Sequence, residues 1–176
     1  MKENGKAKLV CFSGLLSPWV TCLFRKGNTM THTRYAFIKA KWHPNIVDRS
    51  LEGFLEVISK DLVDVYDVPG ALEMPLMAKS LAETGKYSVI AAAAFVVDGG
   101  IYRHDFVAQA VVDGLVQAGM ETNIPVLSIS LTPHQYQETE FHDRIFQEHF
   151  KEKGREAANA ALGIICLLYT SDAADE

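Results

Sequence analysis

The chain has 176 residues, a length that suits one domain with a substantial buried core. Hydrophobic residues make up 48% and charged residues 22%, and the net charge is −5, which is ordinary for a globular protein. No basic stripe that would suit nucleic acid is present, and no apolar run is long and uninterrupted enough for a membrane span. The three cysteines, Cys11, Cys22 and Cys166, are odd in number and show no C-x-x-C spacing, so we expect a reducing compartment and a cytoplasmic protein.

The two ends of the chain do not fit the pattern of its middle. Residues 7–24 are apolar but interrupted by serine, threonine and proline, and a signal peptide is one interpretation of them. The strand-like pattern begins only after Met30. We interpret residues 1–33 as an unstructured or artefactual extension, residues 34–165 as a single domain, and residues 166–176 as an atypical C-terminal tail.

Strand and helix patterns alternate along the first half of the domain. Residues 34–40 read as a short strand, and apolar residues then recur at helical spacing over 45–59. Residues 61–68 alternate apolar and polar side chains as a strand does, and the helix that follows closes near Gly85. Residues 88–97 form a continuous apolar run, which predicts a strand covered on both faces.

The second half continues the alternation. It predicts a helix over 104–118, a strand over 125–131, a polar segment over 132–140, and two helices over 141–150 and 154–168. Strands separated by helices indicate parallel β-α-β units, so we expect an α/β fold. Because such sheets bind ligands beyond the C-terminal ends of their strands, the four loops that follow the strands should form the site.

The first two of these loops carry an aromatic residue and a carboxylate. Trp42 follows the first strand, where its indole would either stack on a flat heterocycle or pack over the start of the helix. Gly70 and Ala71 follow the second strand and let backbone amides approach a ligand. Glu73 would accept hydrogen bonds from polyol hydroxyls or complement the helix dipole.

The third loop, DGGIYRHDF, is the most informative. Its glycine pair, Gly99 and Gly100, follows a buried strand and suits a phosphate or a carbonyl, although the loop matches neither the Walker A motif nor G-x-G-x-x-G. Arg103 would bind phosphate, and His104 would act as an acid or a base. The alternative is a capped helix with solvated charges.

Five segments occur together in an order and spacing that are specific: FIKAKWHPNIVD, DVPGALEMP, AAFVVDGGIYRHDFVA, PVLSISLTPH and HFKEKGREAANAAL. Together they resemble the lumazine synthase family, in particular its second (type II) bacterial branch. The resemblance implies a flavodoxin-like three-layer α/β/α sandwich with a four-stranded parallel sheet. It also implies a transferase of riboflavin biosynthesis. Such an enzyme condenses 5-amino-6-(D-ribitylamino)uracil with 3,4-dihydroxy-2-butanone 4-phosphate, giving 6,7-dimethyl-8-(D-ribityl)lumazine and releasing phosphate.

The resemblance also assigns substrate contacts to this chain, with sites that lie between subunits of a homopentamer or of a dimer of pentamers. The expected contacts are Trp42 on the pyrimidine; Gly70, Ala71, Leu72 and Glu73 on the ribityl chain; Phe95, Val96 and Val97 on the uracil edge, largely through backbone; Gly100 and Ile101 on the butanone phosphate; Ser128 from a neighbouring subunit; and His142, with Arg144 as the alternative, as a second phosphate anchor.

One position departs from the better-known branch of the family. Arg103 stands where that branch has a proton-donating histidine, and His104 follows it. Because a guanidinium stays protonated, we hypothesise that Arg103 binds phosphate or polarises, while His104 or water moves protons. Ile101 stands where a phosphate-binding threonine is usual, so phosphate affinity would be weaker.

The expected condensation needs orientation and modest acid–base help, so we expect no cofactor and no metal. Three other functions stay open on the same fold. The first is a non-catalytic lumazine or flavin binder, and the second is a scaffold whose assembly is its function. The third is a generic FMN carrier, which the first loop disfavours because it lacks a Ser/Thr-rich phosphate cradle.

Overall fold

A four-stranded parallel sheet forms the centre of the protein, whose computed structural model describes residues 33–98 and 103–172. Its strands are β1 (Tyr35–Ala40), β2 (Val63–Val68), β3 (Val89–Phe95) and β4 (Val126–Leu131), in the spatial order β2-β1-β3-β4. The chain passes to one side of β1 for β2 and to its other side for β3. The loops that follow β1 and β3 therefore flank the point where the strand order reverses, which is where such sheets bind ligands.

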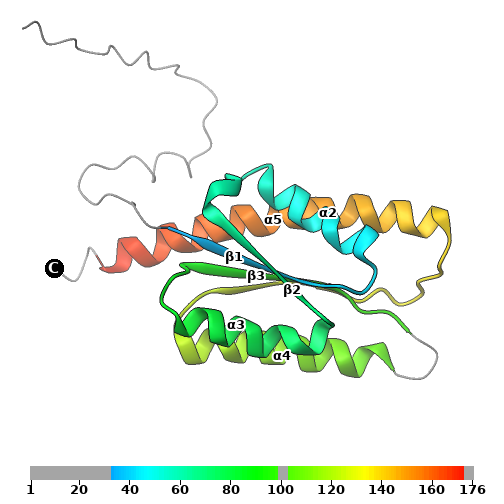
Figure 1. Ribbon diagram of the computed structural model, residues 1–176, viewed down its shortest axis with the longest axis horizontal. Helices are drawn as coiled ribbons and strands as arrows, with labels where there is room; N and C mark the ends of the chain where they lie inside the picture. The colour runs from blue at the N-terminus through cyan, green and yellow to red at the C-terminus, as the bar shows by residue number, and fades with distance from the viewer. Residues whose placement is uncertain (1–32, 99–102, 173–176) are drawn as a thin grey trace, which may run out of the picture. The chain divides into compact units, whose positions relative to one another are not determined.

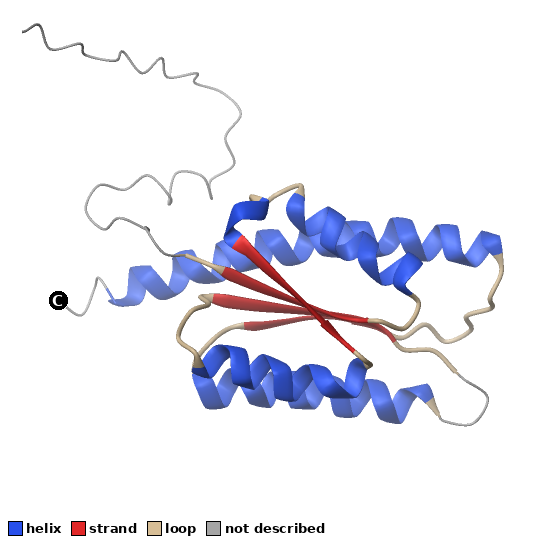
Figure 2. Cartoon of the chain, in the orientation of Figure 1, coloured by secondary structure: helices blue, strands red, loops and turns tan. Residues whose placement is uncertain are grey.

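Helices cover both faces of the sheet (Figures 1 and 2). Helices α2 (Pro44–Leu55) and α5 (Glu140–Asp172) lie on one face, and α3 (Met74–Glu83) and α4 (His104–Thr122) lie on the other. Two single 3-10 turns, η1 (Lys60–Leu62) and η2 (Ala71–Glu73), precede β2 and α3. The predicted flavodoxin-like three-layer sandwich is confirmed.

The strand sequences explain why the sheet is covered on both faces. Successive side chains of a strand point to opposite faces, so Phe37 of β1 packs under α2 and α5 while Ile38 packs under α3 and α4. Every residue of β3 is buried. The continuous apolar run that predicted a doubly covered strand therefore corresponds to the central strand β3.

The predicted pair of helices at the C-terminal end of the domain was wrong, because α5 is continuous from Glu140 to Asp172. Gly154, where the break was expected, lies inside the helix against α2. A Cβ atom on Gly154 would lie 1.9 Å from the Ser50 carbonyl oxygen, and one on Gly53 would lie 1.9 Å from the Lys151 carbonyl oxygen. Two glycines therefore allow the backbones of α2 and α5 to touch, which makes Gly154 part of a helix contact.

The extension predicted at the N-terminal end and part of the tail predicted at the C-terminal end lie outside the described residues. Residues 1–32 and 173–176 are outside the described residues, and α5 continues into the predicted tail as far as Asp172. Among the described helices, none combines the length and the apolar character that crossing a membrane requires.

Candidate functional site

The loops that follow β1 and β2 meet at the C-terminal edge of the sheet. The backbone N–H of Lys41 donates a hydrogen bond to the carbonyl oxygen of Val68, at 3.0 Å, and this ties the two loops together. Trp42 is 69% exposed. A Cβ atom on Gly70 would lie 3.9 Å from Trp42 Nε1 and 3.0 Å from Glu73 Oε2. The structure thus brings the indole, the bare glycine backbone and the carboxylate together.

The second loop continues into the turn η2 and then into α3. Ala71 is half-buried, and Leu72 and Glu73 are exposed. Glu73 stands at the N-cap of α3 but makes no side-chain capping hydrogen bond. Its carboxylate is therefore not used to satisfy the first amides of the helix, which leaves it available to a ligand.

Beneath these two loops, Lys39 joins α2 to β2. Its Nζ lies 2.7 Å from Asp48 Oδ1 and 3.0 Å from Asp67 Oδ1, and only 18% of the side chain is exposed. Burial by itself lowers the pKa of Lys39, but the hydrogen bonds to the two carboxylates outweigh it and leave the pKa above its ordinary value. This charged group fixes the start of α2 relative to the end of β2.

At the third loop, Arg103 and His104 face different partners. The guanidinium of Arg103 is 2.6 Å from Asp105 Oδ2 and stacks over the Phe106 ring, and its side chain is 69% exposed. His104 begins α4 with only 16% of its side chain exposed, and its Nδ1 lies 2.8 Å from Asp98 Oδ1. Of the predicted phosphate contacts, Gly100 and Ile101 lie outside the described residues.

An aromatic cluster joins the first loop to the segment that follows β4. The His43 ring lies 5.5 Å from the Phe95 ring and 5.6 Å from the Tyr136 ring, and the latter two are 4.9 Å apart. His43 has a left-handed backbone, with φ of 51°, and its carbonyl accepts the first hydrogen bonds of α2. Phe95 is buried within this cluster, with 4% of the residue exposed.

Polar contacts extend this cluster to the start of α5. The Tyr136 hydroxyl donates a hydrogen bond to Asp143 Oδ1, and Asn45 of α2 donates to Asp143 Oδ2 at 3.4 Å. Burial, and then the hydrogen bond to the carboxylate, raise the pKa of Tyr136 well above its ordinary value. The half-buried Asp143 side chain therefore links α2, α5 and the loop between β4 and α5.

His142 and Arg144, the two candidate phosphate anchors, differ in their surroundings. The Nδ1 atom of His142 accepts a hydrogen bond from the backbone N–H of Gln137 at 3.0 Å, and the residue is half-buried. This hydrogen bond requires any single proton on the neutral ring to sit on Nε2. Arg144 is exposed. His142 is therefore the more firmly oriented of the two.

Three further predicted residues lie on the strands or at their ends. Val96 is buried, and its N–H donates to the Leu131 carbonyl at 2.9 Å, while Val97 is half-buried. Ser128 is exposed in the middle of β4, where it pairs with Ala92. Three residues of strand separate it from the C-terminal end of β4, roughly 10 Å. The structure therefore does not bring Ser128 to the other predicted residues within one chain.

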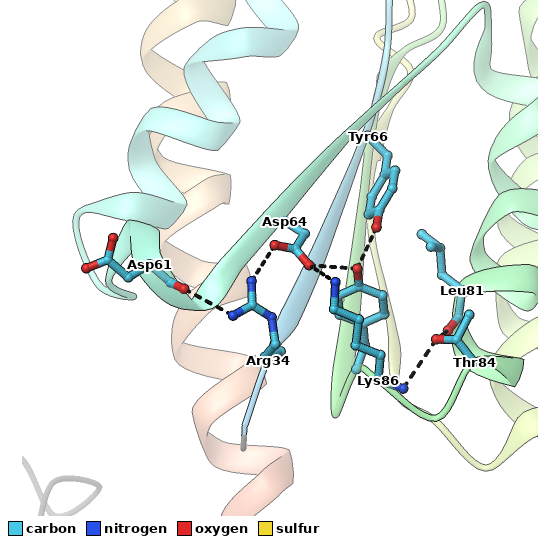
Figure 3. A network of polar contacts seen from close by, with 8 residues as sticks. Arg34, Asp61, Asp64, Tyr66, Leu81, Thr84 and Lys86 are labelled. Atoms are coloured by element: carbon cyan, nitrogen blue, oxygen red, sulfur yellow. Dashed lines mark hydrogen bonds and ion pairs between the residues drawn. The ribbon is translucent and has the colours of Figure 1, made fainter. Parts of the chain in front are cut away.

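A second polar cluster lies at the opposite, N-terminal edge of the sheet (Figure 3). Asp64 of β2 accepts hydrogen bonds from Lys86 at 2.6 Å, from Arg34 and from Tyr87 at 2.8 Å, and these lower its pKa far below the ordinary value. Burial and the hydroxyl of Tyr66 raise the pKa of Tyr87 to about 12. The cluster holds together the segments that lead into three strands, at the edge away from the loops.

Sequence reasoning missed the partners that orient the candidate residues, namely Asp98 beside His104, and Tyr136 with Asp143. The only signals were an aspartate directly after a buried strand and an aromatic residue within a polar segment. Among the residues that the structure describes, no group of three or more histidine, cysteine, aspartate or glutamate side chains is placed to hold a metal ion.

Comparison of the sequence with known proteins shows which enzymes the chain is similar to. The family model of 6,7-dimethyl-8-ribityllumazine synthase matches residues 32–169. The chain is 54% identical to the 6,7-dimethyl-8-ribityllumazine synthase of Rhodococcus erythropolis over 132 residues, which is 72% of this chain and 85% of that protein. It is 48% identical to the 6,7-dimethyl-8-ribityllumazine synthase 2 of Pseudomonas syringae pv. tomato (78% of this chain, 84% of that protein). It is 47% identical to the corresponding synthase 2 of Bradyrhizobium diazoefficiens (72% and 79%).

Proposed function

The chain belongs to the 6,7-dimethyl-8-ribityllumazine synthase family, and on that premise we propose that it works at the C-terminal edge of its sheet. The chain is a transferase of riboflavin biosynthesis that condenses 5-amino-6-(D-ribitylamino)uracil with 3,4-dihydroxy-2-butanone 4-phosphate and releases phosphate. The observation that carries the location is the meeting of Trp42, Gly70 and Glu73, because an aromatic face beside a carboxylate suits a flat pyrimidine with a polyol chain.

In this arrangement, Trp42 stacks on the pyrimidine and Glu73 accepts hydrogen bonds from ribityl hydroxyls. The exposure of the indole supports the first role, and the missing helix cap supports the second. Gly70, Ala71 and Leu72 line the same polyol through the loop backbone, while Phe95, Val96 and Val97 offer backbone groups to the uracil edge.

Phosphate and proton handling divide between neighbouring residues of the third loop. We assign the phosphate to Arg103, with Gly100 and Ile101 beside it, and proton transfer to His104. The support is that Arg103 is exposed and cationic, whereas His104 is largely covered and lies against a carboxylate. His142, fixed through its Nδ1, is the second phosphate anchor.

Kinetics of separate Arg103→Ala and His104→Ala variants test this division. We expect Arg103→Ala chiefly to raise KM for the butanone phosphate, and His104→Ala chiefly to lower kcat with an altered pH profile. An activity loss confined to the Arg103 variant, together with a changed pH profile, would contradict the assignment.

A homo-oligomer, a pentamer or a dimer of pentamers, completes the proposal. Four large apolar side chains lie exposed on α3 and α4, namely Leu76, Phe106, Val116 and Met120, each at least 58% accessible. Apolar side chains gathered on neighbouring helices are typical of surfaces covered by another protein. Ser128, which lies away from the site of its own chain, would reach the site of a neighbour.

The decisive experiment is the two-substrate condensation, followed by lumazine absorbance and by phosphate release. We expect product from the parent protein and from a version that starts at Met30, with size-exclusion chromatography giving the assembly of each. Binding of lumazine or flavin without turnover would identify a non-catalytic binder. Normal assembly without binding or turnover would identify a scaffold.

A further inference from the structure

His43, which lies between Trp42 and Pro44, has an unusual backbone conformation. Its φ of 51° and ψ of 55° are left-handed, although a residue that precedes proline is normally extended. Within the part of the chain that the structure describes, Asn123 is the only other non-glycine residue with a positive φ. A backbone conformation of this kind persists only where the surrounding contacts hold it.

Two sets of contacts hold the turn at His43. Its carbonyl oxygen accepts hydrogen bonds from the backbone N–H groups of Ile46 at 2.9 Å and Val47 at 3.0 Å. Its ring meets the Phe95 and Tyr136 rings edge to face, at interplanar angles of 85° and 81°. The His43 side chain makes no capping hydrogen bond to α2. The carbonyl therefore serves the helix, whereas the ring fixes the turn against β3 and the segment after β4.

The direction of the Trp42 side chain depends on the backbone on either side of it. Because the residue is 69% exposed, contacts of the indole itself contribute little to its orientation. On the N-terminal side, the backbone is tied to the end of β2 by the hydrogen bond from Lys41 N–H to the Val68 carbonyl. On the C-terminal side, it is fixed by the turn at His43.

We propose that His43 is a positioning residue, whose ring in the aromatic cluster holds the Trp42 indole in place for the pyrimidine. The proposal rests on the proposed function, in which Trp42 stacks on that substrate. Without the ring, the turn would sample other conformations, and the pyrimidine would bind only the fraction of molecules with the indole in place. Tyr136 would keep its contacts with Phe95 and Asp143, so the phosphate side of the site should change little.

The test separates the ring of His43 from its backbone conformation. His43→Asn removes the ring but keeps a residue type that tolerates a left-handed backbone, and His43→Phe keeps an aromatic ring. Asn123→Ala is the matched control, because it disturbs the other left-handed residue, at the end of α4 and away from the substrate loops. All variants carry Trp19→Phe, which leaves Trp42 as the single tryptophan of the full chain.

The fluorescence anisotropy of Trp42 is measured without substrate, and its quenching gives the Kd for 5-amino-6-(D-ribitylamino)uracil. In His43→Asn we expect lower anisotropy and a roughly tenfold rise in Kd and in KM for this substrate. The KM for the butanone phosphate should stay within about threefold of the parent value. His43→Phe should restore anisotropy and Kd, and the control should lose thermal stability but match the parent in both.

A purely structural role of His43 would lower stability in His43→Asn without changing anisotropy or Kd, and that result would overturn the proposal. A His43→Phe variant as impaired as His43→Asn would also overturn it. His43→Gly, which lacks the ring and adopts a left-handed backbone without strain, replaces the asparagine variant if that protein does not fold. A parent protein whose Trp42 fluorescence does not respond to the pyrimidine would instead refute the proposed stacking, since anisotropy is measured without substrate.

Discussion

Gly154→Ala is expected to destabilise the protein, although alanine is the better helix former. Inside α5, exchange of glycine for alanine would by itself stabilise the helix by about 1 kcal/mol. The added Cβ would, however, lie 1.9 Å from the Ser50 carbonyl oxygen and 3.0 Å from the backbone nitrogen of Phe54. Helices α2 and α5 must therefore separate, because neither of these backbone atoms can rotate away as a side chain would.

The loss of stability depends on how far the two helices must move apart. An ordinary contact begins at 3.4 Å, so the Cβ and the oxygen must part by 3.4 − 1.9 = 1.5 Å. A gap of that size between α2 and α5 loosens the fully buried rings of Phe54 and Phe150. Overpacking of this kind costs about 3 kcal/mol, so the net loss after the helix-propensity gain is about 2 kcal/mol. For a domain of this length, Tm should fall by roughly 4–8 °C.

Thermal unfolding followed by circular dichroism, at one fixed protein concentration, checks this prediction. Glu148→Ala is the control, since it places alanine at an exposed position of the same helix. The control should change Tm by no more than about 2 °C, because its effect on stability is small. A Gly154→Ala protein with unchanged or raised Tm would refute the reasoning, because helix propensity alone would then account for the result.

Three further changes probe other parts of the fold by urea denaturation. Gly85→Ala should cost about 1 kcal/mol and Gly85→Asn clearly less, because φ is +66° and no atom lies within 4 Å of the added Cβ; equal losses would contradict this. Tyr136→Phe should cost about 1 kcal/mol through the lost hydrogen bond to Asp143, and no loss would show that bond to be unimportant. Asp64→Asn should cost about 1–2 kcal/mol at pH 7. Because the folded pKa of Asp64 is depressed, this difference should shrink as pH falls below about 4, and a constant difference would exclude the charge as its origin.

Strand positions could be predicted from the sequence because local signals specify them. The apolar run over residues 88–97 and its breaking glycines enclose β3, which spans Val89–Phe95. The polar–apolar alternation before Pro69 locates the end of β2 at Val68. In each case, the residues that form the strand also carry the pattern, so no distant part of the chain is needed to recognise it.

The helix ends that were predicted wrongly depend on distant contacts. From the sequence alone, Gly154 suggests the end of a helix. In the structure its missing side chain makes room for the backbone of α2, about a hundred residues earlier in the chain. Helix α4 runs past Gly119 to Thr122, because Gly119 packs against Ile124 and the helix ends only where Asn123 adopts a positive φ. Helix propensity describes neither contact.

The candidate site divides in the same way. The rule that parallel sheets bind ligands at the C-terminal ends of their strands was enough to select the loops that carry Trp42 and Glu73. The partners that orient side chains there could not be predicted, because Asn45 and Asp143 are brought together only by the packing of α2 on α5. Asp98 and His104 are close in sequence, but six residues is not a spacing that any regular element brings together.

The position of the Asp64 cluster has a consequence for engineering. Arg34, which donates to Asp64, is the residue just before β1, so it marks where the described chain enters the sheet. That entry point lies at the edge opposite the loops of Trp42 and Glu73. A domain or label fused upstream of Thr33 would therefore attach at the far edge of the sheet from the substrate loops.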